Sequence, residues 1–564
     1  MKLRTLIFTF ALALLAQIVT PAGATTYYVR TDGGDATQCT GLANAAYPGS
    51  GSGVACAWKN PQYAIPPGYI GDGTPAPRIA AGDTLVISPG TYPMGYGTPG
   101  AESCKSNYTY ACVLDAYTGR YLPNNITITG ANGGLCPSMP VLWGSGHQQD
   151  LIDVTNTSGI TISCLELTDH ATCTEWNTNY KAGVVAICSN SPPTNLGAQD
   201  GIEVYNTPTG PSPGTRHTNN LILTNVYIHG FTHDGIHVGG LTGTTILDHV
   251  EICCNAESGW DGDIGEGGTS SNSGTILIKN SGIDWNGCSE NYPAVGTMAT
   301  CVAAEQGGYG DGLGTYATGG NWRFINDHFL HNTSDGLDLL YADGTGSVFV
   351  DRVTSEFNLS QQVKVNGPGT VQNSVINGDC SEFTGMGPVP AERCRALGNA
   401  VELDNNAANQ TLTFQNNTVT GNGDCLIDSG PGSGAVGGFD PVSSDVLNIK
   451  SNILLGQVSY LGKNGGAYTC GFYTSGVPTV NFTSNILWHY RNNTCGNGLT
   501  CVDPLLKNET GASFDATPLT GSPALGATTA CTTVDWGSQT RGNPCTIGAI
   551  ETTTTPQQPN YTGN

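Results

Sequence analysis

The chain has 564 residues, and its 44 acidic residues outnumber its 20 basic residues, so that the net charge at pH 7 is −24. A negative charge of this size disfavours nucleic acid and anionic membranes as partners. Only 11% of the residues are charged, while 79 are glycine, about twice the average share. This composition disfavours a helical protein and favours strands joined by tight turns.

The first segment of the chain has the pattern of a secretory signal peptide. Lys2 and Arg4 precede an apolar run over residues 6–19, and residues 22–24 (Ala-Gly-Ala) fit a cleavage site. The apolar run is too short to span a membrane, and no later stretch is long enough. We therefore expect residues 1–24 to be removed and the protein to be secreted, periplasmic or held at the cell surface.

All 20 cysteines follow this segment, and their even number suits complete pairing in an oxidising compartment. Cys253 and Cys254 are adjacent, and neighbouring side chains of a strand point to opposite faces, so these two are expected to bond to different partners. Short separations predict three loop staples, which are Cys104/Cys112, Cys164/Cys173 and Cys495/Cys501.

A short repeat of alternating apolar and polar residues recurs along the chain, with the period of a half-buried strand. The closest copies lie about 21–26 residues apart, the length of one solenoid turn with three short strands. The sequence therefore predicts an all-β fold, a right-handed parallel β-helix solenoid stapled by disulfides, which grows in one dimension without dividing into domains. The copies are Ile160–Leu167, Leu221–Ile228, Ile246–Ile252, Ile276–Ile283, Trp322–Phe329, Val348–Val353, Val371–Ile376, Leu412–Val419, Leu447–Ile453 and Val480–Ile486.

Asparagine occupies one register of several copies. Its amide can bond backbone groups at a bend, and asparagine tolerates the left-handed backbone conformation. We therefore expect a structural stack of asparagines without a catalytic role. Its members are Asn225, Asn280, Asn326, Asn373 and Asn416.

A second repeat follows the first within each turn and consists of Asp-Gly, or a substitute, followed by an apolar-x-apolar triplet. The copies begin at Asp200, Asp234, Asp311, Asp335, Gln362 and Asn399. The apolar residues should face the core, so the residue between them should face outward. This pattern predicts an outward column of Glu203, His237, Gly314, Asp338, Lys364 and Glu402.

Two interpretations of this column are open. It could be a solvated ladder of weak ion pairs, and the Asp-Gly pairs could serve only the turns, with Asp bonding local backbone and Gly at positive φ. We prefer that explanation for Asp200 and Asp234. Nearly every outward position is ionisable, however, and Lys364 falls between two acids, about 4.8 Å from Asp338 if the two occupy adjacent turns. This favours a functional role around Lys364.

Both ends of the chain resemble secreted bacterial pectate-lyase-like β-helices. Residues 26–29 (Thr-Tyr-Tyr-Val) and 81–92, with Ala-Gly-Asp-Thr and Pro-Gly-Thr-Tyr, resemble their opening turn. Residues 521–525 and 547–551, with Asp535 and Arg541 between them, resemble their closing segment. We therefore expect an N-terminal cap with the first turns over 25–145, the β-helix with loop insertions over 146–551, and a disordered tail over 552–564.

The segment over residues 332–341, followed by Lys364, is similar to the pectate lyases of polysaccharide lyase family 9. In that family an Asp-Gly-aromatic-Asp segment and an Asp of the preceding turn hold calcium, and a Lys of the following turn is the base. The resemblance implies Ca²⁺ ligands at Asp311, Asp335 and Asp338, and a base at Lys364. Ser334 stands where the family usually has another Asp, and Leu337 replaces the aromatic residue.

This resemblance implies β-elimination of an acidic, uronate-containing polysaccharide by a monomeric enzyme. Ca²⁺ prefers oxygen ligands and would acidify the proton beside the substrate carboxylate. Neutral Lys364 would remove that proton, but nearby carboxylates raise a lysine pKa, so calcium dependence and an alkaline optimum are expected. The residues expected to contact the polysaccharide are Glu203, His237, Glu402 and Tyr341.

Two other functions stay open. A non-catalytic extracellular carbohydrate- or matrix-binding protein would suit the cysteine content and the incomplete calcium set. A glycoside hydrolase would need two carboxylates that flank the scissile bond, for which Asp311 with Asp335 or Asp338 could serve. The Gly-His-Gly and Arg-x-Lys motifs of polygalacturonase β-helices are absent from the sequence.

Overall fold

The computed structural model describes residues 23–67, 75–104, 112, 114, 122–131, 136–146, 150–169, 198–204, 217–262, 272–288, 290, 310–315, 318–340, 342, 345–379, 399–404, 409–429, 444–457, 469–474, 479–490 and 493–552. The expected signal peptide lies outside these residues except for Gly23 and Ala24, and so does the expected tail except for Thr552. The described residues form strands and two short 3₁₀ turns, Pro61–Tyr63 and Gly511–Ser513, and none of their helices could span a membrane.

Ten short strands stack in parallel to form one sheet, called here the ten-stranded sheet. They are β6 (Asp150–Asp153), β8 (Asp200–Val204), β10 (Ile236–Val238), β13 (Trp260–Asp261), β16 (Leu313–Gly314), β19 (Leu337–Leu339), β22 (Val363–Asn366), β25 (Val401–Asp404), β28 (Cys425–Ser429) and β31 (Cys470–Thr474). Six of these strands, β8, β10, β16, β19, β22 and β25, carry the copies of the second sequence repeat.

A further 24 strands form a second hydrogen-bonded network with two rows. Three long strands belong to both rows: β7 (Ser158–Thr168), β9 (Thr218–His229) and β12 (Thr244–Cys253). The first row adds β1 (Thr26–Gly34), β2 (Thr84–Ile87), β4 (Thr127–Gly130), β11 (Leu241–Thr242), β14 (Thr275–Lys279), β17 (Asn321–Ile325), β20 (Ser347–Asp351), β23 (Gly369–Gln372), β26 (Thr411–Gln415), β29 (Val446–Lys450) and β32 (Thr479–Thr483). The second row adds β3 (Thr91–Gly95), β5 (Val141–Gly146), β15 (Gly282–Asp284), β18 (His328–Leu330), β21 (Thr354–Glu356), β24 (Val375–Gly378), β27 (Thr418–Gly421), β30 (Ile453–Gly456), β33 (Asn485–Trp488) and β34 (Leu499–Cys501).

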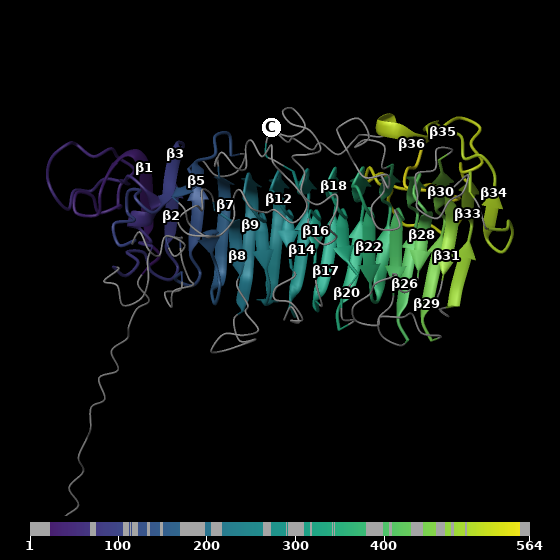
Figure 1. The fold of residues 1–564 in the computed structure, drawn as a ribbon, viewed down its shortest axis with the longest axis horizontal. Helices are drawn as coiled ribbons and strands as arrows, with labels where there is room; N and C mark the ends of the chain where they lie inside the picture. The colour runs from purple at the N-terminus through teal and green to yellow at the C-terminus, as the bar shows by residue number, and fades with distance from the viewer. Residues whose placement is uncertain are drawn as a thin grey trace, which may run out of the picture.

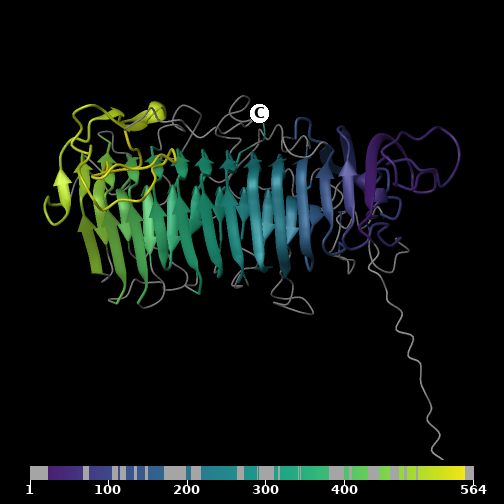
Figure 2. The ribbon, with the colours of Figure 1, turned by 180° about the vertical axis from the view of Figure 1, so that it is seen from behind.

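The strands stack along the long axis of the molecule, and the chain advances from the purple N-terminal end to the yellow C-terminal end (Figure 1). The view from behind shows the same order along the opposite face (Figure 2). Every pairing between the stacked turns is parallel, and β35 (Leu506–Asn508) with β36 (Asp515–Pro518) forms an antiparallel pair near the end of the chain. The expected fold class, a parallel β-helix, is confirmed.

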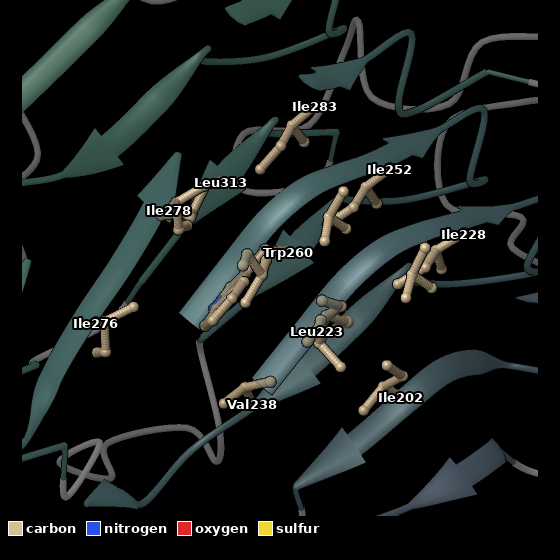
Figure 3. Packing of buried hydrophobic residues seen from close by; sticks show 14 of the residues in the cluster. Ile202, Leu223, Ile228, Val238, Ile252, Trp260, Ile276, Ile278, Ile283 and Leu313 are labelled. Carbon is tan, nitrogen blue, oxygen red and sulfur yellow. The ribbon is translucent and has the colours of Figure 1, made fainter. Parts of the chain in front are cut away.

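The core consists of ladders of apolar side chains that repeat from turn to turn. Leu223, Leu247, Ile278 and Phe324 occupy one register of successive strands, and each is at most 1% exposed. Figure 3 shows Leu223, Trp260 and other side chains from different rows directed into the same interior. Complete burial of one such side chain stabilises the fold by about 1.5–3 kcal/mol. The apolar face of each strand therefore points inward, and the alternation in the sequence shows which face that is.

The asparagines of the first repeat lie at bends, as expected. Asn225, Asn280, Asn326, Asn373 and Asn416 all have positive φ, between 51° and 61°. Two further asparagine ladders are fully buried. They consist of Asn255, Asn286, Asn332 and Asn358, and of Asn417, Asn452 and Asn485, with each side-chain oxygen accepting hydrogen bonds from the preceding member. These ladders satisfy backbone groups inside the bends.

The glycines of the Asp-Gly repeat have a different role from the one expected. Gly201, Gly235, Gly312 and Gly336 do not have positive φ. A Cβ at Gly235 would lie 2.3 Å from Ile252 Cγ2, and one at Gly312 would lie 2.5 Å from the carbonyl oxygen of Gly336. The expectation of positive φ is therefore wrong, because close stacking of successive turns is what requires glycine here.

Gly259 occupies the same place in the turn between Asp234 and Asp311, where Ser258-Gly259 replaces Asp-Gly. A Cβ there would lie 2.3 Å from Ile283 Cγ2 and 2.6 Å from the carbonyl oxygen of Gly312. We expect Gly259→Ala to lower the free energy of unfolding by about 1–3 kcal/mol, because the stacked turn must move. Urea unfolding measures this, with Gly421→Ala as control, since a Cβ at Gly421 meets nothing closer than 3.4 Å. Equal losses in both variants would contradict the prediction.

Two of the three expected disulfide staples, Cys104–Cys112 and Cys495–Cys501, are confirmed. The pairing of Cys164 with Cys173 is wrong, because Cys164 bonds to Cys136. Cys253 and Cys254 bond to each other, not to different partners. Cys254 lies at the bend after β12 with a φ of 61°, so its side chain does not follow the alternation of the strand. The other described pairs are Cys39–Cys56, Cys425–Cys470 and Cys531–Cys545.

The closing segment folds back against earlier turns. The Arg541 guanidinium donates hydrogen bonds to Asn373 Oδ1 and to the carbonyl oxygens of Gly548 and Ala549. Trp536 Nε1 donates to Thr354 Oγ1 on β21. The segment therefore covers outward faces of the second row and leaves the ten-stranded sheet to carry the candidate site.

Candidate functional site

The outward column expected from the second repeat exists in the ten-stranded sheet. Glu203 pairs in register with His237, and Lys364 lies between Asp338 and Glu402. The sequence pattern missed other members of this column. Asp428 lies opposite Glu402 on β28, and Asp261 lies between His237 and Gly314 on β13. Ser258-Gly259 replaces Asp-Gly in that turn, so the repeat was not detected there.

Lys364 is the centre of a buried ion cluster. Its Nζ lies 2.8 Å from Asp335 Oδ2 and 2.9 Å from Asp338 Oδ2. The side chain of Lys364 is 13% exposed, and those of Asp335 and Asp338 are 6% and 11% exposed. Screening by water is weak at such exposure, so the cluster differs from the solvated ladder of weak pairs that the sequence also allowed.

The three aspartates of this cluster are held in place by backbone N–H groups. Asp311 Oδ1 accepts a hydrogen bond from the Asp335 backbone N–H at 2.9 Å, and Asp335 Oδ1 accepts one from the Gln361 N–H at 2.7 Å. Asp338 Oδ1 accepts one from the Leu340 N–H at 2.8 Å. One oxygen of each carboxylate is thus fixed, which orients the other oxygen. The sequence predicted that aspartates would bond to local backbone. Asp338 does so, whereas Asp311 and Asp335 accept hydrogen bonds from the backbone of the next turn.

Gly314 lets one of these carboxylates approach the sheet closely. A Cβ at Gly314 would lie 2.6 Å from Asp311 Oδ2. One ligand atom each of Asp311, Asp335 and Asp338 lies within 4.8 Å of the others. Three carboxylates this close together form an all-oxygen donor set, which is the type that Ca²⁺ prefers. The residues implied as calcium ligands therefore fit the ion.

Burial and charge shift the proton affinities of the cluster in opposite ways. Burial raises the pKa of Asp338 to about 7 against the opposing effect of Lys364. Burial, together with the charge of Asp335, also raises the pKa of Asp311. For Lys364, burial lowers the pKa, but the carboxylates of Asp335 and Asp338 outweigh it, and the pKa lies well above the usual value. Lys364 therefore holds its proton while both carboxylates face it.

The other residues expected to bind substrate are divided between two places. Glu402 is opposite Lys364 on β25, and Glu402 Oε2 accepts a hydrogen bond from Gln361 Nε2 at 3.0 Å. Glu203 and His237 contact each other near the N-terminal end of the sheet, away from the cluster. Tyr341 lies outside the described residues. Gln361, which touches both Asp335 and Glu402, was missed because neutral side chains in a bend give no sequence signal.

No protein-family model and no curated protein matches the sequence. Several solved structures are similar at low identity. Pectate lyase Pel9A is 13% identical, with 94% of this chain and 97% of that chain covered and a TM-score of 0.43. XylC in complex with xylose is 10% identical, with 93% and 98% covered and a TM-score of 0.47. The A-module of the mannuronan C-5 epimerase AlgE6 from Azotobacter vinelandii is 14% identical, with 75% and 91% covered and a TM-score of 0.40. These similarities concern the fold alone.

Proposed function

We propose that the chain is a secreted polysaccharide lyase that cleaves a uronate-containing polysaccharide by calcium-assisted β-elimination. The observation that supports this most directly is the contact of Lys364 with both Asp335 and Asp338, next to Asp311, on successive turns of one sheet. A base and an all-oxygen cation site would thereby be adjacent, as calcium-assisted β-elimination requires.

The shape of the sheet suits an extended polymer. The outward column continues from Glu203 on β8 to Asp428 on β28, with one position for each turn. Turns about 4.8 Å apart offer a regular series of polar contacts along a straight line. A linear polysaccharide can follow such a line, and Glu402 would contact it beside the reacting sugar, with His237 and Glu203 farther along.

Asp311, Asp335 and Asp338 would hold Ca²⁺, which when bound would neutralise the substrate carboxylate and acidify the adjacent carbon-bound proton. Lys364 Nζ would remove that proton. Without Ca²⁺, Asp335 and Asp338 keep Lys364 protonated. If both carboxylates bound Ca²⁺, their charge would no longer raise the pKa of Lys364, and its burial would lower that pKa. The fixed inter-turn hydrogen bonds of Asp311 and Asp335 would keep both carboxylates oriented during this exchange.

The proposal is tested by incubating the purified protein with a panel of polyuronates at several pH values, with Ca²⁺ or with a chelator. We expect ultraviolet absorbance to rise on at least one substrate as unsaturated ends form, with more activity at alkaline pH because the base must be neutral. Chelator should abolish the rise, and added Ca²⁺ should restore it.

Other products would favour the other functions. New reducing ends without ultraviolet absorbance would identify a glycoside hydrolase. Retention of a polysaccharide without any product would identify a binding protein. An absorbance rise that chelator leaves unchanged would refute the role of calcium and keep only the elimination.

A further inference from the structure

The N-terminal part of the outward column contains a second group of metal-ligating side chains. Asp200 and Glu203 lie on β8, and His237 is opposite Glu203 on β10. One ligand atom of each residue lies within 4.8 Å of the others. The group is three turns from Asp338, since β10 pairs with β13, β13 with β16 and β16 with β19. At about 4.8 Å per turn the separation is roughly 14 Å, so the two groups are distinct.

The contacts inside this group leave one acceptor unsatisfied. His237 Nδ1 lies 2.7 Å from Glu203 Oε2, and Asp200 Oδ1 accepts a hydrogen bond from the Asp234 N–H at 3.2 Å. Glu203 is 1% exposed, and its second oxygen, Oε1, is buried and has no hydrogen-bond partner within the part of the chain that the structure describes. A buried carboxylate oxygen without a donor costs free energy unless a cation satisfies it.

The charge balance also points to a cation. Asp200 is 5% exposed and Glu203 is 1% exposed. Among the described side chains, His237 is the one cation that forms an ion pair with Glu203. Asp150 and Asp153 lie opposite Asp200 and Glu203 on β6 and add further carboxylates. One imidazole thus faces several buried carboxylates, and a divalent ion bound among them would stabilise their charged form.

We propose that Asp200, Glu203 and His237 form a second metal site, which binds a divalent transition-metal ion such as Zn²⁺. Zinc binds imidazole nitrogen and carboxylate oxygen at about 2.0–2.2 Å. Imidazole selects such ions over Ca²⁺, which prefers the all-oxygen set of Asp311, Asp335 and Asp338. The ion would lie between His237 Nδ1 and Glu203 Oε2, in place of the proton between these two atoms. Glu203 Oε1 would bind the same ion. The assignment of this metal site does not rest on the proposed lyase activity.

A matched control exists on another face of the β-helix. His328 Nε2 lies 2.8 Å from Asp284 Oδ2 and 3.7 Å from Glu251 Oε1, so this group offers one imidazole and two carboxylates as well. The side chains of His328 and Asp284 are 8% and 12% exposed, against 24% for His237 and 2% for Glu203. His328→Asn therefore removes a histidine that also faces two carboxylates and is more deeply buried than His237.

The test is equilibrium dialysis of the metal-stripped full chain against Zn²⁺, with Ca²⁺ in excess and bound metal measured by atomic spectroscopy. We expect the wild-type protein to bind Zn²⁺ and His237→Asn to weaken this binding by at least about 100-fold, because even loss of a residue that only orients a ligand costs 10–100-fold. His328→Asn should leave the affinity within about twofold. Lys364→Met should also bind Zn²⁺ normally, which separates this result from the lyase proposal.

Folding is checked by the thermal unfolding transition of each variant. If His237→Asn does not fold, Glu203→Gln, which keeps the size of the side chain, decides in its place, and its Zn²⁺ affinity should fall by at least about tenfold. The assignment is overturned if the wild-type protein binds no Zn²⁺, if the folded variant at Glu203 or His237 binds as well as wild type, or if His328→Asn is the variant that loses the ion.

Discussion

Replacing Lys364 by methionine is expected to reduce the rate of unsaturated-product formation by about 10²–10⁴-fold, the usual contribution of a general base. Methionine keeps most of the apolar stem and removes the amine that contacts Asp335 and Asp338. The ultraviolet assay at saturating Ca²⁺ measures the rate. Ca²⁺ binding, measured by calorimetry, should be retained or strengthened, because an ammonium group no longer competes for the two carboxylates.

Lys279→Met is the control for this change. Lys279 Nζ forms an ion pair of 2.8 Å with Asp248 Oδ2, but it lies on β14 and its side chain is 35% exposed. Its loss should leave the rate within about twofold, since an exposed pair contributes at most about 1 kcal/mol to stability. A Lys364→Met protein with the wild-type rate would exclude Lys364 as the base, whereas equal losses in both variants would indicate a general effect of removing charge.

Replacing Asn452 by leucine is expected to lower the free energy of unfolding by about 3–5 kcal/mol. Asn452 Oδ1 accepts hydrogen bonds from the Asn417 N–H and Nδ2, and Asn452 Nδ2 donates to Asn485 Oδ1 and to the Phe414 carbonyl oxygen. Leucine has a similar size but removes all four bonds and takes the side-chain acceptor away from the buried Asn417 N–H. A buried group left unsatisfied costs about 1–3 kcal/mol. Urea unfolding and protection from proteolysis measure the loss.

Asn481→Ala is the matched control, because Asn481 is an exposed residue of β32 whose Nδ2 donates to Asn448 Oδ1 on the neighbouring turn. An exposed substitution of this kind should change stability by no more than about 0.5 kcal/mol. The two asparagines differ mainly in burial. A loss of similar size in both variants would therefore show that the buried ladder has no special role in stability.

Much of the fold follows from local rules that the sequence displays directly. Alternating apolar residues define the strands, and asparagines at the bends, such as Asn280 and Asn326, adopt the left-handed conformation that they tolerate better than most residues. The Asp-Gly repeat also predicted that Asp338 and Lys364 would share a column. This worked because the side chains of a strand alternate with period two, so the identity of an outward residue is fixed as soon as its apolar neighbours are known.

Other features were decided only by the stacking of turns that loops of different lengths separate. The backbone hydrogen bond from Asp335 to Asp311, the partner of Cys164 and the position of Asp261 in the column all depend on which residue of the next turn comes to lie opposite. The sequence of one turn does not encode how many residues separate it from its partner in the next turn. Glu203 Oε1 is a further example, because its burial and its lack of a donor among the described residues are properties of the assembled turns and not of any one strand.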